Sequence, residues 1–222
     1  MKGKLAILML AVLVLSFSLA VAAPSGASTT AGTSETGTAT SSSSLNADGG
    51  NVTYVDVSSN VITSRWAGFY GNVSGNLLLA DASANNFYQW TVGSMDGAVV
   101  YAASGSVSDW SSTNIVPLTN ANAPAWVQGA ATDNFTNTFS ATESFSSSSL
   151  TIASTPYVTT YNSTGVAGNL KTYALYATAE TAHVWAGKVV DDANGFNGNS
   201  VDYQILLPAQ TGTTYNFYLE LP

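Results

Sequence analysis

The chain has 222 residues, of which five are basic, thirteen are acidic, one is histidine and none is cysteine, so its formal net charge is −8. Five basic residues are too few to neutralise a phosphate backbone, and the composition therefore argues against nucleic-acid binding. The lack of cysteine excludes disulfides and thiolate metal sites, and a single histidine excludes multi-histidine metal centres.

Residues 1–22 have the pattern of a secretory signal peptide. Lys2 and Lys4 precede a long apolar run, and the small residues Ala20 and Ala22 suit cleavage before Ala23. The alternative is a retained membrane anchor, because about 18 apolar residues can just span a bilayer. Cleavage leaves three basic residues against thirteen acidic ones, a formal charge of −10. We expect a secreted protein at the cell surface, which touches a membrane only through this segment if it stays uncleaved.

Residues 23–50 form a low-complexity linker. The 27 residues from Pro24 to Gly50 include seven serines, six threonines and five glycines, and Leu45 is their only large apolar residue. Such a stretch buries too little apolar surface to offset the entropy of ordering it, which predicts a disordered tether.

From residue 51 onward, short runs rich in Val, Thr, Tyr, Phe and Trp alternate with Gly, Asn, Asp and Ser clusters, which is typical of strands and turns. No window has a helical stripe. The expected strands are 52–57, 61–70, 76–80, 87–92, 97–103, 135–139, 157–161, 171–178, 182–190, 202–207 and 215–221. We predict an all-β fold, an antiparallel sandwich of two sheets with about ten to twelve short strands, in one domain over residues 51–222. The serine run 146–149 leaves open a division into two subdomains.

A tripeptide occurs twice, as Trp66-Ala67-Gly68 and as Trp185-Ala186-Gly187, each time inside a strand-like run. A glycine at such a place lets a neighbouring group lie close against the backbone. The repeat indicates either an internal duplication or a shared packing requirement at these two places.

Four asparagines lie in N-x-[ST] sequons, the acceptor motif for N-linked glycans: Asn51, Asn72, Asn134 and Asn162. An occupied sequon has to be exposed on a loop or at a strand end. We therefore predict a glycoprotein with these four candidate sites.

The segment 191–202 is the richest in carboxylate and amide oxygens, which are the ligands that Ca²⁺ prefers. Its candidate ligands are Asp191, Asp192, Asn194, Asn197, Asn199 and Asp202. The alternative is a plain turn, since turns use the same residue types. We predict no other cofactor.

The sequence does not indicate an enzyme. His183 follows Glu180 by three residues, but no G-x-S-x-G motif accompanies it and no pair of carboxylates is recognisable as a glycosidase site. A structural histidine is the simpler interpretation.

Of the five tryptophans, Trp66, Trp90 and Trp185 lie in apolar strands and are expected in the core. Trp110 and Trp126 lie in loop-like contexts, where a flat ring could stack on a sugar. These two residues support an alternative function as a secreted carbohydrate-binding module whose partners are glycans.

The stretch 64–76, which contains W-A-G-F-Y-G-N-V, resembles a segment of secreted archaeal cell-surface proteins, and residues 201–221 resemble their closing pair of strands. The resemblance extends over most of residues 52–222. It implies a β-rich extracellular domain in an archaeal cell envelope or filament, and it implies no catalytic residues.

The segment 51–57 follows a flexible lead and is a candidate donor strand with the apolar residues Val52, Tyr54, Val55 and Val57. In strand form, Val52, Tyr54 and Asp56 lie on one side and Thr53, Val55 and Val57 on the other. Surface β proteins can polymerise when such a segment completes the sheet of the next subunit. We therefore expect a structural protein, such as a pilus-like filament subunit, which associates with itself or with other cell-envelope proteins. The alternative is an ordinary first strand of the chain's own sheet.

Overall fold

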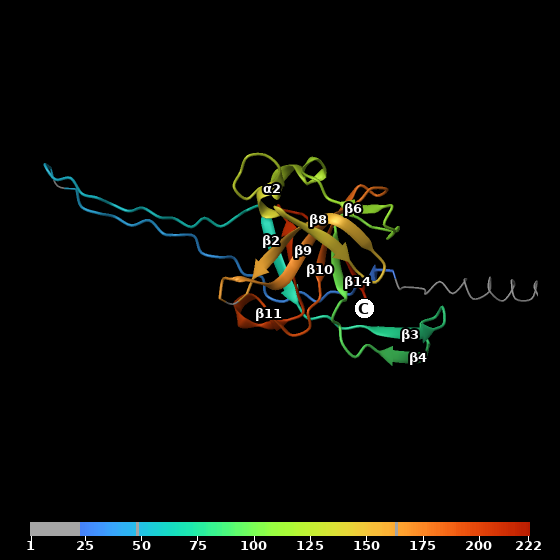
Figure 1. Cartoon of the computed structure of the whole chain (residues 1–222). Helices are drawn as coiled ribbons and strands as arrows, with labels where there is room; N and C mark the ends of the chain where they lie inside the picture. Colours follow the sequence, from blue (N-terminus) through green and yellow to red (C-terminus); the bar gives the residue numbers. More distant parts are fainter. Residues whose placement is uncertain (1–22, 48, 163) are drawn as a thin grey trace, which may run out of the picture.

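The computed structural model describes residues 23–47, 49–162 and 164–222, and the predicted signal peptide lies outside this range. An eight-stranded antiparallel sheet forms the centre of the fold (Figure 1). Its strand order is β1-β14-β5-β10-β9-β8-β7, with β6 beside β9. In chain order these strands are β1 (Ser25–Gly26), β5 (Val99–Ala103), β6 (Ile115–Pro117), β7 (Ala141–Ser146), β8 (Thr151–Tyr161), β9 (Ala167–Ala177), β10 (Ala182–Lys188) and β14 (Asn216–Glu220).

Three two-stranded pairs complete the described strands. They join β2 (Trp66–Gly71) to β13 (Tyr203–Pro208), β3 (Asn76–Ala80) to β4 (Asn86–Thr91), and β11 (Ala193–Asn194) to β12 (Ser200–Val201). The helical segments are short: η1 (Asn120–Asn122), η2 (Ala125–Val127), α2 (Phe135–Thr138) and η3 (Phe196–Gly198). The predicted all-β class is confirmed.

Both faces of the central sheet are buried, and all five residues of β5 illustrate this. Val100 and Ala102 on one face join Trp185 in a core that is covered by β13 and by the phenylalanines of the α2 region. Tyr101 on the other face belongs to a second core with Phe145 of β7. A strand that is buried on both faces has a continuous apolar sequence, as the five residues of β5, VVYAA, do.

The central sheet curls so that the turn between β7 and β8 reaches β14, next to the opposite edge strand β1. The Ser149 amide, in the turn between β7 and β8, donates to Glu220 Oε1 of β14 at 2.5 Å, and Ser148 Oγ donates to the Leu221 carbonyl at 3.3 Å. One face of the sheet is thus covered by its own end and the other by the β2–β13 pair. The predicted sandwich of two sheets is not confirmed.

Two of the expected strands are wrong. Residues 135–139 begin as the helix α2, because Asn134 accepts a hydrogen bond from the Asn137 amide and so caps the first turn. Residues 52–57 belong to no strand. The serine run 146–149 is the turn between β7 and β8, where the Ser147 amide donates to the Leu150 carbonyl.

Candidate functional site

The most unusual part of the molecule is an extended loop between β1 and β2, which runs far out from the body and back again (Figure 1). We call its returning limb, residues 49–62, the arm. Its large apolar residues are exposed: Val52 by 102%, Tyr54 by 86% and Val57 by 88%. The Thr40 amide donates to the Asn60 carbonyl at 3.1 Å and links the two limbs. The donor segment 51–57 itself pairs with no strand of the described residues.

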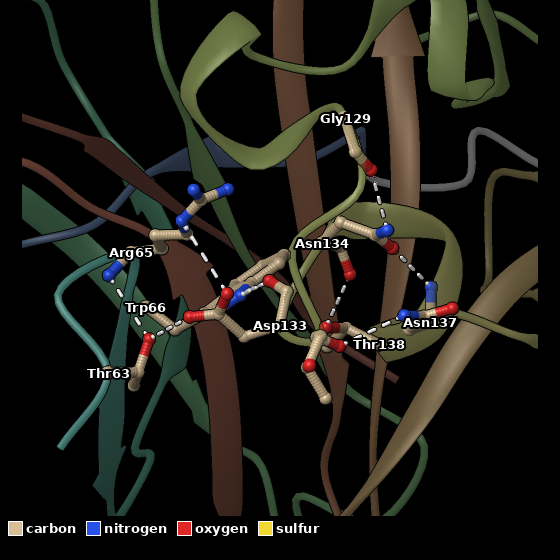
Figure 2. A network of polar contacts seen from close by, with 9 residues as sticks. Thr63, Arg65, Trp66, Gly129, Asp133, Asn134, Asn137 and Thr138 are labelled. Carbon is tan, nitrogen blue, oxygen red and sulfur yellow. Dashed lines mark hydrogen bonds and ion pairs between the residues drawn. The ribbon is translucent and has the colours of Figure 1, made fainter. Parts of the chain in front are cut away.

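The arm joins the body at a fixed point in front of β2 (Figure 2). Thr63 Oγ1 donates to Asp133 Oδ2 at 2.7 Å, the Arg65 guanidinium lies 3.5 Å from Asp133 Oδ1, and Trp66 Nε1 donates to the Asp133 carbonyl at 2.6 Å. The next residue, Asn134, caps α2, so the same short loop holds both the helix and the root of the arm. These contacts therefore hold the point from which the arm leaves the body.

The other end of the loop lies on the sheet edge formed by β14. Ser25 and Gly26 pair with Leu219 and Tyr218, and the Ala27 amide donates to the Phe217 carbonyl at 3.0 Å. The predicted tether is thus ordered at its start, where it covers an edge that would otherwise expose unpaired backbone groups. Residues 28–47 form no regular structure and are exposed.

The four sequons differ in exposure. Asn51 lies on the exposed arm and Asn72 in the exposed turn after β2, while Asn162 is half-buried between β8 and β9. The expected exposure is wrong for Asn134, which is only 8% exposed. Its Nδ2 atom, the one that would carry a glycan, donates to the Gly129 carbonyl at 2.7 Å. Its short polar side chain serves as a helix cap.

The carboxylates of the candidate calcium segment accept hydrogen bonds from protein groups: Asp202 from backbone amides, and Asp191 and Asp192 from the hydroxyls of Ser94 and Ser200. Asp202 is buried, and its Oδ2 accepts from the Val73 amide at 2.7 Å while its Oδ1 accepts from the Asp192 amide at 3.2 Å. Asp191 contacts Ser94 outside the loop. Asn194 pairs with Ser200, Asn197 has a φ of +56°, and Asn199 Nδ2 donates to the Phe196 carbonyl. Within residues 23–47, 49–162 and 164–222, no group of three or more His, Cys, Asp or Glu residues is placed to hold a metal ion.

The two tryptophans nominated for sugar stacking are half-buried and packed. Trp110 lies 4.8 Å from the Tyr101 ring and 5.1 Å from the Tyr218 ring, centroid to centroid. Trp126 is partly buried and packs against the core that contains Trp185, and its Nε1 atom is buried. Trp185 is in the core as predicted, whereas the prediction for Trp90 is wrong, because its side chain is 50% exposed on the β3–β4 hairpin.

His183 and Glu180 belong to separate local networks. His183 Nε2 lies 2.8 Å from the Asn122 carbonyl and Nδ1 lies 3.2 Å from Ser104 Oγ, and burial lowers the pKa of this histidine. Because Nε2 faces a carbonyl, it carries the proton, and Nδ1 accepts from Ser104. The Ser104 hydroxyl also accepts a hydrogen bond from the His183 amide at 2.9 Å. The same hydroxyl therefore contacts both the ring and the backbone of His183.

Glu180 fastens the loop that follows β5. Its Oε1 accepts from the Ser108 amide and hydroxyl, each at 2.9 Å, and its Oε2 accepts from Asn114 Nδ2 at 2.8 Å. The hydrogen bonds from Asn114 and Ser108 lower the pKa of Glu180 to about 2. The carboxylate is therefore engaged in holding its own loop rather than in orienting His183.

Comparisons with protein families, curated proteins and solved structures find no match to this chain. Over the part of the chain that the structure describes, no helix is both long and apolar enough to cross a membrane.

Proposed function

We propose that this protein is a secreted structural component of the cell surface, whose copies assemble when the arm of one completes the sheet of another. The observation that carries the proposal is the exposed and unpaired state of residues 51–57, although their sequence is rich in β-prone residues. An extended β-prone segment without a partner in its own chain is the donor that strand complementation requires.

The root of the arm supports the same function. A donor strand binds more tightly when less freedom is lost on binding, and the contacts of Asp133 with Thr63, Arg65 and Trp66 fix where the arm begins. The rest of the loop is polar and keeps the arm in water until a partner takes it up. We place the protein outside the cell because residues 1–22 have the pattern of a signal peptide.

The alternative, a carbohydrate-binding module, loses support. Trp110 and Trp126 were its candidate contacts, and both rings are packed against other aromatic or apolar side chains of their own chain. A stacking platform needs rings whose faces are open to the sugar.

The test is the assembly state of the secreted chain, measured by sedimentation and electron microscopy. Replacing the apolar residues Val52, Tyr54, Val55 and Val57 with serine is expected to leave the body folded and to abolish assembly. The control replaces four polar residues of the outgoing limb, Thr30, Thr33, Thr36 and Thr38, and is expected to assemble normally. A wild-type chain that stays monomeric at high concentration, or an arm variant that assembles like wild type, would refute the proposal.

A further inference from the structure

The β3–β4 hairpin stands apart from the rest of the body. It projects away from the central sheet (Figure 1), and β3 and β4 pair only with each other among the described strands. An isolated two-stranded hairpin is marginally stable in water, and a third strand with an apolar face is generally needed. The hairpin is therefore structurally incomplete in the single chain.

One face of this hairpin is entirely apolar. Leu77 pairs with Trp90 and Leu79 with Tyr88, so these four side chains lie on the same side, and each is about half exposed. The Tyr88 and Trp90 ring centroids are 4.8 Å apart. On the other side Leu78 pairs with Gln89, and Phe87 is 85% exposed. Aromatic residues without charges are typical of the centre of a protein–protein interface.

The hairpin is joined to the body by close contacts at its base. A β carbon at Gly75 would lie 2.5 Å from Leu221 Cδ2, and the Val73 amide donates to the buried Asp202 carboxylate at 2.7 Å. On the far side, Met95 and Ala98 are buried at the two ends of a turn whose Gly97 has a φ of +86°, and the Ala98 amide donates to the Met95 carbonyl at 2.9 Å. The hairpin is thus presented on a firm base.

The tip of the hairpin is polar. Asp81 Oδ1 accepts from the amides of Ser83 and Asn85 at 2.9 and 2.8 Å, and Asp81 Oδ2 accepts from Asn85 Nδ2 at 2.8 Å. These hydrogen bonds lower the pKa of Asp81, so the tip carries a charge. Entry into lipid tip-first would bury that charge, and the hairpin has no basic residue to contact anionic headgroups. The apolar face therefore suits a protein partner.

We propose that the open edge of β4 is the acceptor for the arm of a second copy, so that residues 52–57 of one chain become the third strand of the hairpin of the next. This inference rests on the proposed function and names its binding site. Six residues of the arm match the six residues of β4 in length. In strand form, Thr53, Val55 and Val57 share one side, and they extend the face that carries Tyr88 and Trp90.

Charge and geometry select a second copy as the partner. Two copies of an acidic chain repel each other over most of their surfaces, but residues 76–91 carry only Asp81 and residues 49–62 only Asp56. In Figure 1 the arm and the hairpin point away from the body in opposite directions, so they lie apart within one chain. The arm and the hairpin are two different surfaces of identical copies, so a contact between them joins the copies head to tail. Such contacts form an open filament unless the copies close into a ring.

Cysteine cross-linking tests the contact directly, because the chain has no cysteine of its own. Secreted full-length Val55→Cys protein is mixed with a tagged Tyr88→Cys or Trp90→Cys protein and oxidised. A disulfide needs Cβ atoms about 4 Å apart, so a tagged heterodimer is expected with at least one of the two. Tyr161→Cys, at an equally exposed aromatic residue at the end of β8, is the matched control and is expected to give none. Equal cross-linking at Tyr161, or none at the hairpin, overturns the proposal.

Assembly assays separate this inference from the function on which it rests. Trp90→Ser with Leu77→Ser is expected to raise the assembly concentration at least tenfold, while Tyr161→Ser leaves it unchanged and circular dichroism confirms a folded body in both. If the arm variant abolishes assembly and the hairpin variant does not, arm-mediated assembly stands and the hairpin is not its acceptor. If the hairpin variant instead loses binding to phospholipid vesicles with assembly intact, the partner is a membrane and the proposal falls.

Discussion

Gly187 of β10 lies directly against Ile205 of β13: a β carbon at Gly187 would sit 2.6 Å from Ile205 Cγ1 and 3.0 Å from its Cδ1. This contact is where the β2–β13 pair rests on the central sheet. Gly68, the glycine of the other Trp-Ala-Gly tripeptide, is exposed on β2, and a β carbon there would meet nothing within 4 Å. The shared packing requirement expected for the two tripeptides is therefore wrong, because only Gly187 has a close neighbour.

We predict that Gly187→Ala destabilises the body by about 1–3 kcal/mol, because the added methyl group overpacks a closed interface. Gly68→Ala is the matched control and is expected to change the free energy of unfolding by less than about 0.5 kcal/mol. Urea unfolding of both variants measures the difference. Equal effects at the two glycines would contradict the close packing of β13 on β10.

Glu180 is expected to give the protein a specific acid sensitivity. Its pKa is about 2 in the folded chain and 4.5 in the reference state, so the unfolded chain binds the proton more readily. The stabilisation is fully present above pH 4.5 and is lost as the pH falls from 4.5 towards 2. In Glu180→Gln this contribution is absent, so the Tm difference between wild type and variant should shrink as the pH falls through that window. A Tm difference that stays constant from pH 6 to pH 2 would show that Glu180 is not the source of the acid sensitivity.

Asn134 is expected to act through stability. Asn134→Ala removes the cap of α2 and leaves the Gly129 carbonyl without its donor, at a cost of about 1–3 kcal/mol. Asn134→Asp keeps the capping oxygen and should lose less. Asn72→Ala, in an exposed sequon, serves as the control and should be nearly neutral. Chemical denaturation ranks the three variants.

The proposed assembly is expected to strengthen with ionic strength. Thirteen acidic residues face three basic ones once residues 1–22 are removed, and salt screens the resulting repulsion between copies. The assembly concentration, measured by sedimentation, should fall steadily as NaCl is raised from about 10 mM to about 500 mM. Assembly that weakens with salt would indicate that attraction between opposite charges, and not uncharged surface, drives it.

Calcium gives a control for the same measurement. If Ca²⁺ acts only through ionic strength, CaCl₂ and NaCl at equal ionic strength should have similar effects. An effect of Ca²⁺ at micromolar concentration, abolished by Asp192→Asn, would instead support the predicted ligand set in residues 191–202.

The sequence by itself determined the fold class and many strand positions. Runs such as Val99–Ala103 and Ala182–Lys188 are apolar and β-prone whatever surrounds them, and the alternation in Asn216–Glu220 follows from the strand period. It also singled out residues 51–57, because a short run of β-prone residues directly after a polar, Gly-rich stretch is visible without coordinates.

Only the tertiary structure decided which of these alternating segments are used within the chain. The alternation of apolar and polar residues indicates that one face of a strand needs an apolar neighbour. It does not indicate whether that neighbour belongs to the same chain. Tyr88 and Trp90 have the same pattern as Phe217 and Leu219, yet the first pair is exposed on a projecting hairpin and the second packs against the core. Partner choice depends on contacts between residues far apart in sequence, and local pattern carries no information about those contacts.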